Sequence, residues 1–149
     1  MYFLYIFTNT MKQNMRILAL DFGLKRTGLA ITDENNIIAS GLKTVDSKDL
    51  LSELHRLVAG KKVGTLVLGE PKRLNNTPTH ITENVHILFE VLKKEFPLLH
   101  IVLYDERFTS KMASHAISMS GMTKNKKQDK ALIDEVSATI LLQSYMCSI

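Results

Sequence analysis

The sequence predicts an α/β fold in which helices flank a mixed five-stranded sheet. Two observations predict it: three strand-like apolar runs follow one another closely in the first third of the domain, and later strand-like runs alternate with helical patterns. Strands joined by short turns pair antiparallel, whereas parallel neighbours need a longer crossover that is usually a helix. We therefore expect strands one to three to form an antiparallel meander and strands four and five to be parallel.

The first three strands are predicted at residues 17–21, 27–32 and 37–45. The first is a continuous apolar run, as expected for a central strand that is buried on both faces, and it ends at Asp21. A polar Asp-Glu-Asn-Asn stretch at residues 33–36 separates the second strand from the third and is typical of a tight hairpin.

Helices and strands then alternate. Asp46 or Ser47 can cap a helix that Gly60 ends, and residues 63–68 form the fourth strand. A second helix is predicted from residue 78 or 79 to residue 96, before the fifth strand at residues 99–104.

Two helices close the predicted domain. The first begins at Thr109 or Ser110, and a lysine-rich polar segment at residues 121–129 follows it. The last helix covers about residues 130–146. Its 3.6-residue period predicts an inward face formed by Ile133, Val136, Ile140, Leu141 and Tyr145.

The length of 149 residues fits one domain, which we place at residues 16–149 after an extension at residues 1–15. The aromatic run at residues 2–7 is too short to span a bilayer, so we expect no membrane partner. The single cysteine, Cys147, excludes an intrachain disulfide framework and fits a cytoplasmic protein. A net charge of +4 favours a polyanionic partner such as nucleic acid.

Three acids suit a metal site: Asp21 at the end of the first strand, Glu106 after the fifth, and Asp134 in the last helix. Ligands gather at the carboxyl ends of strands in α/β sheets, and Mg²⁺ or Mn²⁺ takes oxygen ligands. Such ions can clamp the attacking and leaving oxygens of a phosphodiester. Each acid also has a structural interpretation: Asp21 could accept bonds from the Gly23 turn, Glu106 could pair with Arg107, and Asp134 could complement a helix N-terminus.

Three stretches resemble the signature motifs of the YqgF/RuvX family and occur in that family's order. They are LDFGLKRTGLA at residues 20–30, DERFTS at residues 105–110 and KALIDEVSA at residues 130–138. A lone Asp-x-Gly also occurs in actin-like ATPases, but the three stretches together are a specific signal. The resemblance extends over nearly all of residues 16–145.

The resemblance implies a ribonuclease H-like fold and a nuclease that matures the 5′ end of pre-16S ribosomal RNA in the bacterial cytoplasm. It implies that Asp21, Glu106 and Asp134 are the catalytic and metal-binding acids. The resemblance implies that Lys25 and Arg107 hold or neutralise substrate phosphate. We also expect Arg26, Thr109 and Lys130 to contact the substrate, Lys130 as part of a lysine-rich set near the acids that could otherwise be a solubilising surface. Asn75, in a loop where the family has an asparagine, could contact the substrate backbone or simply form a turn.

The sequence departs from the family pattern in two places. Glu70 stands where the family often has leucine, and related resolvases carry a catalytic acid at the end of that strand. Glu70 could therefore supplement or replace Glu106, although the motif around Glu106 matches better. Thr27 stands where the family has a small or aliphatic residue, which we interpret as tolerated packing.

Other functions remain open at this point. A Holliday junction resolvase would act on two symmetric strands and so would require a homodimer, whereas the nuclease could be a monomer. A non-catalytic RNA-binding factor for ribosome assembly would explain the basic charge without cleavage. An actin-like phosphotransferase is suggested only by Asp21-Phe22-Gly23, and the chain is short for the paired domains of such enzymes.

Overall fold

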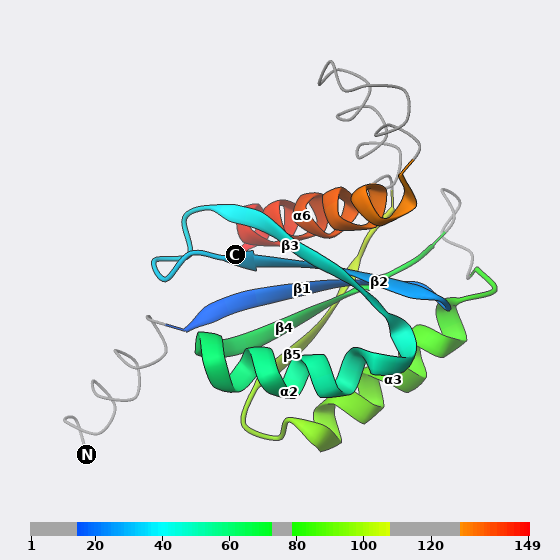
Figure 1. Cartoon of the computed structure of the whole chain (residues 1–149), viewed down its shortest axis with the longest axis horizontal. Helices are drawn as coiled ribbons and strands as arrows, with labels where there is room; N and C mark the ends of the chain where they lie inside the picture. The colour runs from blue at the N-terminus through cyan, green and yellow to red at the C-terminus, as the bar shows by residue number, and fades with distance from the viewer. Residues whose placement is uncertain (1–14, 73–78, 108–128) are drawn as a thin grey trace.

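The computed structural model describes residues 15–72, 79–107 and 129–149, which form a five-stranded mixed sheet between helices (Figure 1). Strand β1 (Arg16–Phe22) lies at the centre of the sheet, whose order is β3-β2-β1-β4-β5. It pairs antiparallel with β2 (Arg26–Thr32), which pairs antiparallel with β3 (Ala39–Asp46). On its other side β1 runs parallel to β4 (Val63–Glu70), and β4 runs parallel to β5 (His100–Asp105). The predicted meander and the parallel pair are confirmed.

Helices cover both faces of the sheet. The 3-10 helix η1 (Ser47–Asp49) leads into α2 (Leu50–Lys61), which lies with α3 (Thr82–Glu95) on one face. Helix α6 (Lys130–Ser148) lies on the other face, so the fold has three layers (Figure 1). No helix in the described ranges combines the length and the apolar composition needed to cross a membrane.

The alternation of side chains along β1 creates one core on each side of the sheet. Leu18 and Leu20 belong to the larger core beneath α2 and α3. Ile17 and Ala19 belong to the smaller core, where they pack with Leu141 of α6. By the same alternation Asp21 lies on the α6 side of the sheet.

Several predicted boundaries are wrong. Strand β3 begins at Ala39 rather than at residue 37, because the amides of Ile37 and Ile38 donate to Oδ1 of Asp33 at 2.7 and 2.8 Å. The helix after β3 begins as a 3-10 turn, and the side chain of Asp46 makes no capping bond. Gly60 lies inside α2, which ends where Lys62 adopts a left-handed conformation with φ of 53°.

The remaining helices also differ from the prediction. Helix α3 starts at Thr82, and the residues before it form a turn in which the Thr79 amide donates to Oγ1 of Thr82 at 2.8 Å. The predicted helix from residue 109 or 110 lies outside the described residues. The buried face of α6 matches the predicted one only at Leu141, since its buried residues are Ser137, Ala138, Leu141 and Leu142. Periodicity misplaced it because α6 carries apolar side chains around most of its circumference.

Candidate active site

Asp21, Glu106 and Asp134 come from three elements that meet at the carboxyl end of β1 and on the α6 face. Asp21 is the penultimate residue of β1 and pairs in register with Gly28 of β2. Glu106 directly follows β5, and its amide donates to the carbonyl of Glu70 at 3.2 Å. Asp134 is in the second turn of α6. The sheet therefore places residues that are far apart in the sequence at one edge.

A hydrogen bond joins the carboxyl groups of Asp21 and Glu106. The intervening strand β4 allows it because Gly69 has no side chain there. A methyl group at Gly69 would overlap Oε2 of Glu106 and would lie 3.1 Å from Cδ2 of Leu141. Gly69 thus leaves the space in which the Glu106 carboxyl group lies.

The pKa values of both carboxyl groups lie well above those of free side chains. Burial, partly offset by the hydrogen bond from Glu106 and reinforced by the charge of Asp134, raises the pKa of Asp21 to about 6. Burial, the charge of Asp21 and the hydrogen bond to it raise the pKa of Glu106 to about 9. Near pH 7.5 the pair therefore holds one proton, which Glu106 donates to the Asp21 carboxylate.

The backbone of α6 places Asp134 against β2. A methyl group at Gly28 would overlap the main-chain carbonyl of Asp134, so this glycine permits the close approach of the helix. Oγ1 of Thr44 in β3 donates to the carbonyl of Ala131 at 2.7 Å. Nε of Arg26 donates to Oδ2 of Asp134 at 3.1 Å.

Burial raises the pKa of Asp134, and the contact with Arg26 offsets part of that rise. The structural role considered for Asp134, complementing the helix N-terminus, belongs instead to Asp129, whose carboxylate accepts from the Ala131 amide at 3.0 Å. The pairing considered for Glu106 is also wrong: Nε of Arg107 donates to Oδ2 of Asp105 at 2.8 Å. Neither of these two structural alternatives is therefore the arrangement that the structure shows.

Glu70 lies on the other face of the sheet. Leu68, two residues earlier, belongs to the core beneath α2 and α3. Oε1 of Glu70 contacts Nε2 of His86 in α3 at 3.3 Å and Nζ of Lys72 at 3.5 Å. In this arrangement Glu106, and not Glu70, joins Asp21.

The structure describes four of the other predicted substrate-contacting residues, and two lie outside the described ranges. Lys25 and Lys130 are exposed, and Arg26 and Arg107 are partly exposed. Asn75 and Thr109 lie outside the described residues.

Next to the turn between β1 and β2, the side chains of Thr27 and Ser47 form a hydrogen bond that was not predicted from the sequence. Oγ1 of Thr27 and Oγ of Ser47 are 2.9 Å apart, and Ser47 donates to the carbonyl of Gly23. Thr27 is completely buried, so it is a hydrogen-bonding residue and not merely tolerated packing. The sequence did carry a signal for this hydrogen bond. Thr27 places a hydroxyl at a strand position that the periodicity predicts to be buried.

The chemistry of the donors fits a divalent cation. The carboxyl groups of Asp21 and Glu106 share a hydrogen bond, the charge of Asp134 acts on Asp21, and hard ions such as Mg²⁺ or Mn²⁺ bind oxygen ligands. The raised pKa values of Asp21 and Glu106 reflect clustered buried acids that a cation would stabilise in their charged form. Among the described residues, no three His, Cys, Asp or Glu side chains are grouped so that they could hold a metal ion as they stand. Asp134 instead contacts Arg26.

Comparison with known proteins identifies the family. A family model described as "RuvX: Holliday junction resolvase" matches residues 15–148. The chain belongs to the RuvX family.

Curated RuvX relatives are similar along almost their whole length. A protein of Christiangramia forsetii is 46% identical over 131 residues, which cover 88% of this chain and 97% of the relative. A protein of Flavobacterium psychrophilum is 47% identical over 131 residues, covering 88% and 96% of the two chains. Both carry the name "Putative pre-16S rRNA nuclease".

The fold of this RuvX chain is also found in a solved structure of Thermus thermophilus RuvC in complex with a Holliday junction substrate. The TM-score is 0.51 at 13% identity, and the match covers 89% of this chain and 96% of that one. This likeness confirms the predicted ribonuclease H-like fold.

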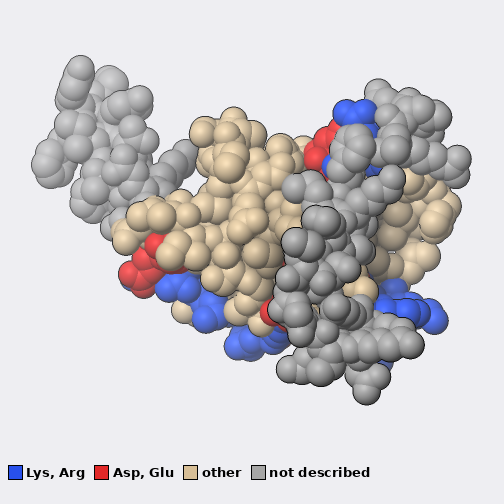
Figure 2. Space-filling view, turned by 90° about the horizontal axis from the view of Figure 1, so that it is seen from above, with Lys and Arg blue, Asp and Glu red and all other residues tan. Residues whose placement is uncertain are grey.

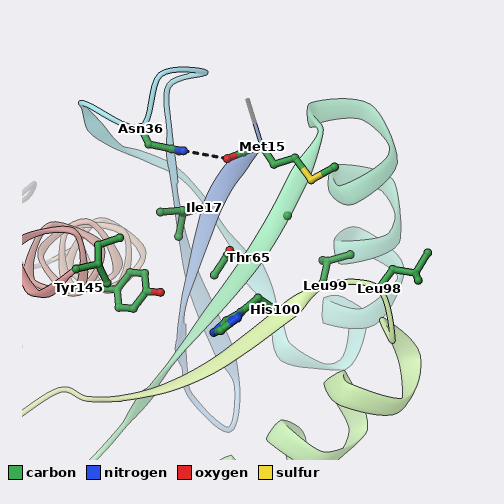
Figure 3. A pocket seen from close by; sticks show the side chains of 10 residues that line it. Met15, Ile17, Asn36, Thr65, Leu98, Leu99, His100 and Tyr145 are labelled. Atoms are coloured by element: carbon green, nitrogen blue, oxygen red, sulfur yellow. Dashed lines mark hydrogen bonds between the residues drawn. The ribbon is translucent and has the colours of Figure 1, made fainter. Parts of the chain in front are cut away.

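The carboxyl cluster of the RuvX chain lies far from a pocket at the opposite end of the sheet. That pocket, of about 460 Å³, is lined by residues near the starts of three strands, among them Ile17, Thr65 and His100 (Figure 3). Asp21 and Glu106 lie at or just beyond the ends of the same set of strands.

Seen from above, the described surface that is visible is mostly uncharged, with charged side chains along its borders (Figure 2).

Proposed function

We propose that this RuvX chain is a metal-dependent nuclease that hydrolyses phosphodiester bonds in the maturation of the 5′ end of pre-16S ribosomal RNA in the bacterial cytoplasm. The observation that carries the proposal is the hydrogen-bonded carboxyl pair of Asp21 and Glu106, with Asp134 close enough to raise the pKa of Asp21. Perturbed acids that cluster at strand ends are typical of catalytic sites. The names of the relatives support the choice of substrate.

Asp21, Glu106 and Asp134 are the proposed ligands of Mg²⁺ or Mn²⁺. A divalent ion bound there would supply Lewis-acid stabilisation of the charge that builds on the phosphate, and would activate the attacking water. The water oxygen would bond to phosphorus and give up a proton to solvent, while the bond from phosphorus to the ribose oxygen breaks and that oxygen takes up a proton from solvent. Glu106 must give up the proton that it shares with Asp21 before all three carboxylates can bind the ion.

Phosphate contacts are proposed for the basic residues that border the acids, and they would hold the substrate without reading its sequence. Lys25 lies in the turn between β1 and β2, and Arg26 begins β2. Arg107 follows Glu106, and Lys130 begins α6. Asn75 and Thr109 remain proposed contacts from outside the described residues.

A second candidate function is Holliday junction resolution, which the description of the matching family names. Resolution of a four-way junction requires two symmetric cuts and therefore a homodimer, whereas cleavage of a single RNA strand requires only a monomer. Substrate preference and oligomeric state together separate the two candidates.

The test is a cleavage assay on precursor 16S RNA, unrelated RNA and a four-way DNA junction, with Mn²⁺ or with chelator. We expect Mn²⁺-dependent cleavage, with the precursor cut preferentially. Asp21→Asn and Glu106→Gln should each reduce the rate by about 100-fold or more, because each removes a charge that stabilises the bound ion. Asp46→Asn, at an exposed residue with no capping bond, is the charge-matched control.

Glu70→Gln decides between the two glutamates. If Glu106 is the ligand, Glu106→Gln should lose far more activity than Glu70→Gln. The reverse order would assign the role to Glu70. Salt-sensitive RNA binding without any Mn²⁺-dependent cleavage would refute the nuclease proposal and favour a non-catalytic assembly factor.

A further inference from the structure

The ion pair between Arg26 and Asp134 lies where the proposed ion and the substrate would meet. Nε of Arg26 is 3.1 Å from Oδ2 of Asp134, and the side chains are 36% and 26% exposed. Both side chains are partly exposed to solvent, so water can replace each partner when the pair opens. An ion pair that is this accessible is weak enough to be exchanged.

We propose that Arg26 is a built-in counter-ion, which a divalent metal displaces from Asp134 and thereby frees to contact the substrate phosphate. The inference rests on the proposed function, since it uses the same three carboxyl groups. It adds an order of events: Arg26 holds Asp134 before the ion binds and holds the phosphate afterwards. Arg26 would then be both a competitor for the ion and a partner of the substrate.

Electrostatics supports the competition. Asp134 acts on Asp21 through its charge, and Asp21 acts on Glu106 in the same way, so the three acids form one repulsive group. Nε of Arg26 donates to Oδ2 of Asp134, an oxygen that a bound ion would also use. Two cations cannot occupy the same side of Oδ2, and each also repels the other.

The place of Asp134 does not depend on Arg26. The close approach of its main chain to Gly28 and the hydrogen bond from Thr44 to Ala131 fix the first turns of α6 on the sheet. Removing the guanidinium should therefore leave the carboxylate near Asp21 while it removes the competing cation. If Arg26 served only to position Asp134, removing its guanidinium would instead weaken metal binding.

The displaced guanidinium remains at the site. Arg26 is the first residue of β2, and its backbone is held in the sheet by pairing with Asp46 of β3. A planar guanidinium that presents several donors suits the oxygens of a phosphodiester. Substrate would thus encounter a free cation only after the ion has bound.

The test measures Mn²⁺ binding by calorimetry at pH 8 without substrate, for the parent chain and for Arg26→Gln. We expect Arg26→Gln to bind Mn²⁺ about three- to tenfold more tightly, the range expected for loss of one partly exposed competing ion pair. Arg56→Gln, which removes the same charge from the exposed pair with Glu53 on α2, is the control and should leave the affinity unchanged. Unchanged or weaker binding by Arg26→Gln would overturn the inference.

Single-turnover cleavage supplies the second readout. Arg26→Gln should cleave at least about tenfold more slowly at saturating Mn²⁺, because the phosphate loses its guanidinium. Arg26→Lys should recover part of this rate. Tighter binding together with slower cleavage supports the inference, whereas a loss of both indicates a purely structural role and overturns it.

The experiment also separates this inference from the proposed function. If the parent chain binds Mn²⁺, and Asp21→Asn abolishes that binding while Arg26→Gln leaves it unchanged, the counter-ion role fails and the metal-dependent nuclease stands. If the parent chain binds no Mn²⁺, both proposals fail. They also fail if Asp21→Asn binds Mn²⁺ with the same affinity as the parent chain.

Discussion

Replacing Asp21 by asparagine should make the metal-free protein more stable while abolishing cleavage. The buried carboxyl group of Asp21 has its pKa raised from 3.8 to about 6, so keeping it charged in the folded protein costs free energy. Roughly two pKa units correspond to about 3 kcal/mol when the group is fully ionised. The amide of asparagine has a similar shape and carries no charge, so this cost disappears.

The sign of the pH dependence follows from the raised pKa. Below the unfolded value of 3.8 both states carry the proton and Asp21 costs nothing. Between pH 3.8 and about 6 the unfolded chain loses the Asp21 proton while the folded chain keeps it, so stability is lost until the folded chain ionises as well. Glu106, raised from 4.5 to about 9, extends the loss to higher pH. The parent chain should therefore become less stable between about pH 4 and pH 9.

The assay is thermal and urea unfolding of the parent chain and Asp21→Asn at pH 4, 6 and 8, with metal chelated. At pH 8 the variant should gain up to about 3 kcal/mol, or about 5–10 °C in melting temperature, and at pH 4 the two should coincide. Asp46→Asn, at an exposed residue, should follow the parent chain. Parallel pH curves, or a variant that is less stable at pH 8, would refute the reasoning.

Three further substitutions test individual contacts, one beside the carboxyl pair, one in α2 and one in β2. Gly69→Ala should reduce cleavage by at least about tenfold while changing stability by less than about 2 kcal/mol, because the added methyl group displaces the movable end of Glu106; unaltered kinetics would contradict this. Gly60→Ala, with nothing within 4 Å, should raise stability by up to about 1 kcal/mol in urea unfolding, and any loss would be unexpected for this helical position. Thr27→Val should cost about 1 kcal/mol by the same measurement because Ser47 loses a partner, and a neutral result would show that the hydroxyl contact contributes nothing.

The succession of strands and helices along the chain, the antiparallel or parallel pairing of the strands and the placement of Asp21 at a strand end could all be predicted from the sequence alone. Residues 17–20 form a continuous apolar run, which only a strand covered on both faces can accommodate, and it ends at Asp21. Short turns force the first three strands to be antiparallel, and the helices between later strands permit parallel pairing. These features depend on residues that are close in the sequence, so they could be predicted from it.

The tertiary structure decided which side chains share the site. Asp21 and Glu70 both lie at strand ends, yet they face opposite sides of the sheet because the parallel register pairs Leu20 with Leu68. A shift of one residue in that register would turn Glu70 towards Asp21. Long-range packing of this kind, including the room that Gly69 leaves for Glu106, depends on contacts between distant segments, and periodicity within one segment carries no information about them.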